Sequence, residues 1–243
     1  MSCSALIIGA SGDIGATIAE RLAADGWSLY LHYNQNQERI CKLQQQLSQQ
    51  YARQDFFALQ LDLTMGTGAV DQLKSQLFQV DAVIFAAGMT TYGLLPEVSA
   101  EQIDALWQVH VKTPMLILQA LQSKLAQSDL GRIVFIGSIY GGRGSAMEVP
   151  YSTVKGAQSA FANAYAQEVG SLGITVNVIA PGAVATKMNQ QFTADEQAAI
   201  AAEIPTGRFA TPTQIAYWVQ TLLAPEANYL TGQTIYVDGG WLK

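Results

Sequence analysis

The stretch Gly9-Ala10-Ser11-Gly12-Asp13-Ile14-Gly15 decides the fold, because it joins a short apolar run at 5–9 directly to a helical pattern at 15–25. Glycines at such a junction let the main chain turn tightly and approach a pyrophosphate, whose charge is met by amide groups at the helix N-terminus. A tight turn without a ligand is the alternative. Asp13 departs from the pattern, since a carboxylate repels an anion unless it turns away or caps the helix.

Short runs of β-forming residues alternate with longer helical patterns along the whole chain. Strands are expected at 5–9, 28–33, 56–61, 81–86, 132–137, 174–179 and 233–237, and the longer helices at 15–25, 37–51, 100–125 and 153–172. Such alternation predicts βαβ units, and therefore an α/β fold with a doubly wound parallel sheet of about seven strands and helices on both faces. No linker-like stretch divides the chain, so residues 1–243 are predicted to form a single domain.

Composition restricts the classes of function. The chain has 243 residues, of which 49% are hydrophobic and 13% charged, as in a compact globular protein. A net charge of −6 and a pI near 4.8 argue against binding of nucleic acid, which needs a basic surface. Cys3 and Cys41 have the spacing of neither a disulfide framework nor a metal site. With no basic leader and no apolar run of about 18 residues, a soluble cytoplasmic protein without membrane contact is expected.

A phenol and an ammonium stand four residues apart in Tyr151-Ser152-Thr153-Val154-Lys155, downstream of the hydroxyl of Ser138. On a helix, positions i and i+4 share one face, with Cβ atoms about 5–6 Å apart. The charge of Lys155 is then expected to lower the pKa of Tyr151 from about 10 toward the range of a general acid or base. Taken alone, such a pair is more often part of a solvated helix face.

Several motifs follow one another in a specific order along the chain. They are Gly9 to Gly15, Ala87-Gly88, Ser138, Tyr151, Lys155, Pro181-Gly182 and the terminal Val237-Asp238-Gly239-Gly240. In this order they resemble the short-chain dehydrogenase/reductase family, and the resemblance covers essentially the whole chain. It implies an NAD(P)-dependent oxidoreductase on a Rossmann-type sheet, assembled as a homotetramer or homodimer.

The resemblance also implies the roles of the site residues. Tyr151 would give a proton to a substrate carbonyl oxygen, Lys155 would lower the pKa of Tyr151 and hold the nicotinamide ribose, and Ser138 would orient the same carbonyl for hydride attack. Cofactor contacts are expected from Gly9, Ser11, Gly12, Asp13, Ile14, Gly15, Tyr33, Asn34, Asp62, Leu63, Ala87, Gly88, Tyr151, Lys155, Pro181, Gly182, Val184 and Thr186.

Two of these assignments carry more detail. Asp62 resembles a residue that contacts adenine, and a helix N-cap is an equally good interpretation. Thr186 resembles a residue that contacts the nicotinamide carboxamide. Residues 183–208 resemble a mobile substrate lid, in which the apolar side chains would exclude water or simply form the core of a small helix. These side chains are Met188, Phe192 and Ile200.

The chain departs from the family pattern at three places. Asp13 replaces a glycine, and Phe85-Ala86-Ala87-Gly88 replaces an asparagine-rich tetrapeptide. His110 occupies the place of an asparagine that supports a water-linked proton relay in the family. Histidine can also hold a water or a main-chain carbonyl and can carry a proton near pH 6.5, so we hypothesise that His110 preserves the relay. A histidine that only fills the space is the alternative.

The choice of dinucleotide depends on the end of the second strand, which reads Leu29-Tyr30-Leu31-His32-Tyr33-Asn34. Members that prefer NAD carry an acidic residue there, and this chain has Tyr33. No carboxylate would repel a 2′-phosphate, and Asn34, Gln35, Asn36 or Arg39 could bind it. The sequence therefore favours NADP(H) over NAD(H).

Two substrate classes are suggested by resemblance. Ile179-Ala180-Pro181-Gly182 and Pro205-Thr206-Gly207-Arg208 are similar to 3-oxoacyl-(acyl-carrier-protein) reductases, which act on a carrier-bound ketone. The basic residues that dock the acidic carrier are replaced by Asp129-Leu130 and Ser171-Leu172, which weakens that match. Tyr92-Gly93-Leu94-Leu95 and Val109-His110-Val111-Lys112 resemble reductases of the ketone-modified lysine of elongation factor P. A dinucleotide-binding regulator without catalysis is the third interpretation.

Overall fold

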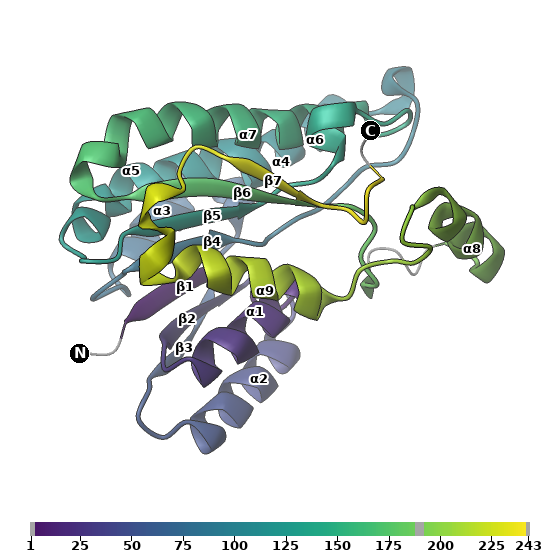
Figure 1. The fold of residues 1–243 in the computed structure, drawn as a ribbon. Helices are drawn as coiled ribbons and strands as arrows, with labels where there is room; N and C mark the ends of the chain where they lie inside the picture. The colour runs from purple at the N-terminus through teal and green to yellow at the C-terminus, as the bar shows by residue number, and fades with distance from the viewer. Residues whose placement is uncertain (1–2, 188–191, 242–243) are drawn as a thin grey trace.

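The computed structural model describes residues 3–187 and 192–241, and it contains one seven-stranded parallel sheet. The strand order is β3-β2-β1-β4-β5-β6-β7, as a doubly wound fold requires (Figure 1). The strands are β1 (Ser4–Ile8), β2 (Ser28–Tyr33), β3 (Phe56–Gln60), β4 (Ala82–Phe85), β5 (Arg132–Ile136), β6 (Thr175–Pro181) and β7 (Thr234–Val237). Each begins and ends within two residues of its predicted bounds, so the predicted fold class is confirmed.

Helices cover both faces of the sheet because the strands from β1 to β6 alternate their side chains between two apolar layers (Figure 1). Ile7 of β1 packs in one layer, whereas Leu6 and Ile8 pack in the other. The first layer is closed by α1 (Asp13–Ala24), α2 (Gln37–Gln50) and α9 (Pro212–Leu223), and the second by α3 (Thr67–Lys74), α5 (Thr113–Ala126) and α7 (Val149–Val169). The remaining helices are α4 (Ala100–Trp107), α6 (Tyr140–Arg143) and α8 (Ala194–Glu203).

The long helix predicted at 100–125 is interrupted. A π-helical turn at Gln108–Lys112 separates α4 from α5, and His110 lies at its centre. Pro114 contributes to this break, since it has no N–H to donate to the carbonyl four residues earlier, which is that of His110. Such turns are frequent at functional sites, and this one packs against α7.

The carboxyl ends of the parallel strands meet at one edge of the sheet. There β1 pairs with β2 on one side and with β4 on the other, so the connections leave in opposite directions and open a crevice. The glycine turn follows β1, and Ser138 follows β5. Helix α8 lies apart from the sheet at this same edge (Figure 1). Among the described residues, no helix is long and apolar enough to cross a membrane.

Candidate active site

A cavity of about 680 Å³ opens at the carboxyl edge of the sheet and collects most of the predicted site residues. Those that line it are Gly9, Ser11, Gly12, Asp13, Ile14, Gly15, Asn34, Ala87, Gly88, Ser138, Tyr151, Lys155, Pro181, Gly182, Val184 and Thr186. Phe192 and Ile200 of the predicted lid also line it, whereas Met188 lies outside the described residues. Residues far apart in sequence therefore form one site.

Four predicted residues do not line this cavity. Tyr33, Leu63 and His110 are buried in the protein. Asp62 caps a short 3₁₀ turn, where its Oδ1 accepts a hydrogen bond of 2.9 Å from the main-chain N of Thr64. The interpretation of Asp62 as a cap is thus confirmed, and its contact with adenine stays a prediction.

The glycine turn packs so closely against the main chain that side chains would not fit at two of its glycines. Gly9 has φ of +91°, and a Cβ added there would lie 2.4 Å from the main-chain N of Ala87. A Cβ at Gly15 would lie 2.2 Å from the carbonyl oxygen of Gly9. Side chains would therefore fill the space that the tight turn and the close strand-to-helix packing require.

His32 holds this turn and was missed by the sequence prediction as a site residue. Its Nδ1 accepts a hydrogen bond of 2.9 Å from the N–H of Gly9, and its Nε2 lies 3.2 Å from the carbonyl oxygen of Leu61. Burial lowers the pKa of His32 to about 4, so the ring is neutral near pH 7 and Nε2 is the donor. A histidine inside an otherwise apolar strand was the available signal.

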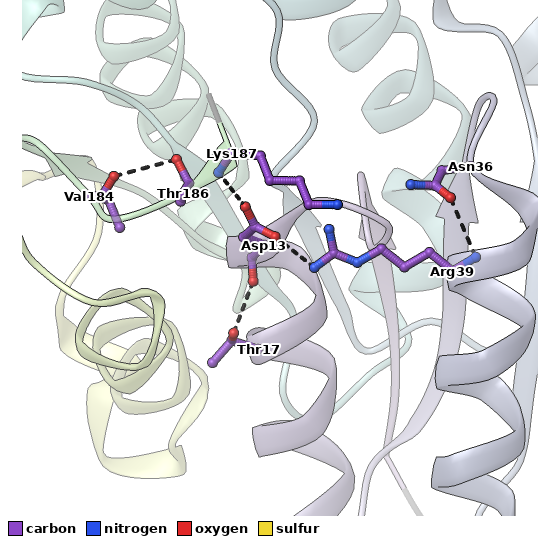
Figure 2. Close-up of polar contacts among 7 residues, drawn as sticks. All are labelled: Asp13, Thr17, Asn36, Arg39, Val184, Thr186 and Lys187. Carbon is purple, nitrogen blue, oxygen red and sulfur yellow. Dashed lines mark hydrogen bonds and ion pairs between the residues drawn. The ribbon is translucent and has the colours of Figure 1, made fainter. Parts of the chain in front are cut away.

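The carboxylate of Asp13 turns toward cationic and amide groups at the cavity mouth (Figure 2). Its Oδ1 accepts a hydrogen bond of 2.7 Å from Nη2 of Arg39, and its Oδ2 accepts one of 2.7 Å from the main-chain N of Lys187. Burial alone would raise the pKa of Asp13, but the bonds from Lys187 and Arg39 outweigh it and hold this pKa below its usual value. The negative charge of Asp13 is therefore balanced by Arg39 and by the main-chain N–H of Lys187.

Tyr151 and Lys155 share one helix face, as predicted. Helix α7 begins at Val149 with Pro150 in its first turn, a position where a missing N–H costs nothing. Nζ of Lys155 lies 5.5 Å from the centroid of the Tyr151 ring, and the hydroxyl of Ser138 lies close enough to the phenol to lower its pKa. The three polar groups thus meet at the wall of the cavity.

The predicted lowering of the Tyr151 pKa is wrong for the protein without ligands. Burial raises the pKa of Tyr151 above its ordinary value, and the hydrogen bond from Ser138 offsets only part of this rise. Burial also lowers the pKa of Lys155 to about 7, because its ammonium lies inside the protein. Removal from water therefore dominates over the attraction between the two side chains.

His110 holds a main-chain carbonyl, which was one of the roles expected for it. Its Nε2 lies 2.9 Å from the carbonyl oxygen of Met89, and its ring meets the Tyr151 ring edge-on at 5.9 Å. Burial and the charge of Lys155 lower the pKa of His110 to about 3. The expectation that it carries a proton near pH 6.5 is therefore wrong. Its Nδ1 is buried without a hydrogen-bond partner among the described residues.

Gln158 and Glu148 belong to the site and were not predicted. Gln158 is 3% exposed and contacts Lys155, three residues earlier on the same helix face. This polar side chain on the apolar face of a helix was a readable signal. Glu148 lines the cavity and accepts a hydrogen bond from Thr90 at 3.1 Å. It lies three residues before Tyr151, at the start of α7, so its position in the sequence was an available signal.

Comparisons with known proteins give a consistent result. Residues 9–242 match a family model described as Enoyl-(Acyl carrier protein) reductase. The chain is 43% identical over 242 residues to the uncharacterized oxidoreductase YmfI of Bacillus subtilis, covering 99% of each chain. It is 31% identical over 239 residues to the 3-oxoacyl-(acyl-carrier-protein) reductase FabG of Escherichia coli, covering 97% of this chain and 96% of that one.

A solved structure shares the whole architecture. The crystal structure of a blue fluorescent protein from a metagenomic library, in complex with NADPH, superposes with a TM-score of 0.91 at 31% identity. The match covers 99% of this chain and 98% of that one. Together with the ordered motifs and the cavity at the switch point of the sheet, these matches show that the chain belongs to the short-chain dehydrogenase/reductase family of oxidoreductases.

Proposed function

We propose that the protein reduces a ketone, with Tyr151 as the proton donor, Ser138 as a hydrogen-bond donor to the carbonyl oxygen, and Lys155 as the cation beside the phenol. The observation that carries this proposal is that Ser138, Tyr151 and Lys155 line the same cavity, with Nζ of Lys155 5.5 Å from the centroid of the Tyr151 ring and the Ser138 hydroxyl close enough to the phenol to lower its pKa. Two adjacent hydroxyl groups can polarise one carbonyl oxygen and stabilise the negative charge that it gains.

The residues at the mouth of the cavity fit NADPH. The pyrophosphate would lie against the main chain of the glycine turn at 9–15, where the N-terminus of α1 supplies amide groups. NADPH supplies the hydride when bound. Arg39 lies at the mouth and no carboxylate ends β2, which favours a 2′-phosphate, and a similar structure is a complex with NADPH. NAD(H) is the alternative cofactor.

The protonation state of the site favours reduction over oxidation. Because burial raises the pKa of Tyr151, its phenol is protonated near pH 7. A protonated phenol can donate to a developing alkoxide, whereas oxidation of an alcohol needs a phenolate as base. This difference supports reduction as the direction of the reaction.

The carboxylates that line the cavity help to choose between the two candidate substrates. Similarity to FabG supports a ketone such as a 3-oxoacyl thioester, whether small or carrier-bound. However, Glu148 and Glu203 line the cavity, and Asp129 and Ser171 stand where basic docking residues are expected. An acidic carrier would meet like charges there. These carboxylates favour the second candidate, the ketone-modified lysine of elongation factor P.

The experiment that tests this function is Tyr151→Phe, assayed by NADPH consumption with a panel of ketones. The panel includes a 3-oxoacyl carrier thioester and ketone-modified elongation factor P. We expect kcat to fall by at least about 10²-fold while NADPH still binds. Tyr165→Phe is the control, because Tyr165 lies on the same helix with its hydroxyl bonded to Gln122. Retained turnover in Tyr151→Phe would remove Tyr151 from the role of acid.

The same panel tests the interpretation as a regulator without catalysis. That interpretation predicts that the wild-type protein binds NADPH and consumes none with every ketone tested. A panel with both NADPH and NADH also ranks the cofactors by kcat/KM. A clear preference for NADH would overturn the proposed cofactor.

We also propose that the chain assembles as a homodimer or homotetramer. Tyr217 and Trp218 of α9 are 49% and 37% exposed, and their ring centroids lie 5.4 Å apart. Aromatic side chains gathered on one surface of a folded chain are typical of an interface. Light scattering of the purified protein measures the assembly, and a monomer at micromolar concentration would contradict it.

A further inference from the structure

The ammonium of Lys155 is buried without a carboxylate partner. Lys155 is 3% exposed, and its Nζ donates hydrogen bonds of 2.8 Å to the carbonyl oxygen of Ile136 and 3.3 Å to Oε1 of Gln158. Among the described residues, the one ion pair of the chain is that between Arg39 and Asp13, which does not include this group. Neutral oxygens therefore hold the cation in place.

Gln158 uses both ends of its amide. Its Oε1 faces the ammonium of Lys155, and its Nε2 donates a hydrogen bond of 2.9 Å to the carbonyl oxygen of His110. The reverse orientation would place an NH₂ group against an ammonium and an oxygen against a carbonyl oxygen, so the chemistry of both neighbours fixes the amide. The side chain is 3% exposed, which excludes bulk water from both bonds.

The carbonyl oxygen of His110 can accept the bond from Gln158 because of the π-helical turn. The carbonyl of His110 has no usual helical donor, since residue 114 is a proline. A buried carbonyl without a partner is costly, and the Gln158 amide satisfies it. The turn at 108–112, helix α7 and the end of β5 are thereby linked through one lysine and one glutamine.

We infer that Gln158 is a positioning residue for Lys155. Its amide carries a hydrogen-bonded chain from the ammonium to the main chain of His110, at the place where the family resemblance calls for a water molecule. This inference rests on the proposed function of Lys155. Water can accept a proton on one side and release another, whereas an amide does so only through its unfavourable imidic form. Gln158 therefore anchors Lys155 and closes this side of the site, so protons reach Tyr151 from the cavity instead.

Two substitutions test the inference in the full-length protein. Gln158→Leu removes both hydrogen bonds at similar volume, and Gln158→Glu keeps the shape but places a carboxylate against the ammonium. Gln122→Leu is the matched control, because Gln122 bonds the hydroxyl of Tyr165 on the far part of α7. NADPH affinity is measured by fluorescence, kcat with the best ketone across pH, and stability by urea unfolding across pH.

For Gln158→Leu we expect kcat to fall by about 10–100-fold while the Gln122→Leu control stays within about twofold of the wild type. For Gln158→Glu we expect the limb of the pH–rate profile that reports Lys155 to move to higher pH, because a carboxylate favours the charged ammonium. The titratable groups beside this ammonium are Tyr151 and His110, and His110 is neutral over the whole range tested.

Unfolding gives a measure that needs no cofactor or substrate. The wild type should gain stability as pH rises above about 7, where the buried lysine loses its proton, and Gln158→Glu should lose this gain. If Gln158→Leu does not fold, Gln158→Glu carries the test alone. Wild-type kcat and an unchanged pH profile in every folded variant would overturn the inference. If Tyr151→Phe retains turnover, the proposed function fails instead, whatever the Gln158 variants do.

Discussion

Two cations line the same cavity and are held in opposite ways. Lys155 lies at its inner wall, buried among neutral oxygens, whereas Arg39 lies at its mouth and pairs with Asp13 at 2.7 Å. Burial lowers the pKa of Lys155 to about 7, and contact with Arg39 helps to hold the pKa of Asp13 below its usual value. The inner cation is therefore tuned by removal from water, whereas the carboxylate at the mouth is tuned by hydrogen bonds from the main-chain N–H of Lys187 and from Arg39.

This contrast predicts where charge matters most. A buried ionised group changes both the chemistry of its neighbours and the stability of the fold. A half-buried pair at the mouth is partly screened by water and salt, so its loss should affect ligand binding more than the stability of the fold. Substitutions at the two positions test this difference.

The largest effect is expected for Lys155→Met. Loss of the ammonium beside the phenol should lower kcat by about 10²–10⁴-fold, as for other groups that assist proton transfer. Stability should not fall, since a methionine of similar length replaces a buried charge without an ionic partner. Steady-state kinetics measure kcat, and thermal unfolding measures stability. Lys124→Met is the control, because Nζ of Lys124 bonds the exposed carbonyl of Phe78. A large loss of stability with a modest loss of kcat would contradict the interpretation that Lys155 serves catalysis and not stability.

Stability should depend on pH through the same lysine. Below about pH 7 Lys155 is charged in both the folded and the unfolded protein, so the cost of its burial is complete. Between its folded pKa of about 7 and the ordinary value of 10.5, only the unfolded chain binds the proton, and the free energy of unfolding therefore rises with pH.

Urea unfolding of the wild type and Lys155→Met measures this dependence. We expect the variant to be more stable by about 1–4 kcal/mol near pH 6.5, with the difference shrinking toward pH 10. A difference that is the same at both pH values would show that Lys155 does not titrate in this range.

A smaller effect is expected for Arg39→Met at the cavity mouth. Loss of one charge-assisted bond to a 2′-phosphate should raise KM for NADPH about tenfold, with less change for NADH and for kcat. Cofactor titrations at low and high salt measure this, with the exposed Arg53→Met as the control. Equal losses for both cofactors would indicate that Arg39 contacts something other than the 2′-phosphate.

The smallest effect on chemistry is expected for His110→Asn. His110 is neutral across the working pH range, since its pKa is lowered to about 3, and an asparagine can still bond the carbonyl of Met89. The pH–rate profile should keep its shape, with kcat within about threefold of the wild type. A shifted profile would restore the hypothesis that the histidine itself takes part in proton transfer.

Local patterns in the sequence account for most of the fold and much of the site. Alternating strand and helix patterns located every strand within two residues, because strands of a parallel sheet are apolar on both faces. The glycine turn and the Tyr151–Lys155 spacing are also local, so they could be placed before any tertiary contact was known. The break at 108–112 was missed, although Pro114 signalled it.

What the sequence alone determined is therefore the topology of the sheet and the set of groups at its carboxyl edge. The electrostatic state of those groups became known only from the folded protein. The pKa of Tyr151 is raised rather than lowered, Asp13 is bonded to Arg39, and Gln158 connects Lys155 to the turn at His110. The physical reason is that periodicity is written along the chain, whereas desolvation and hydrogen bonding depend on neighbours that only folding supplies.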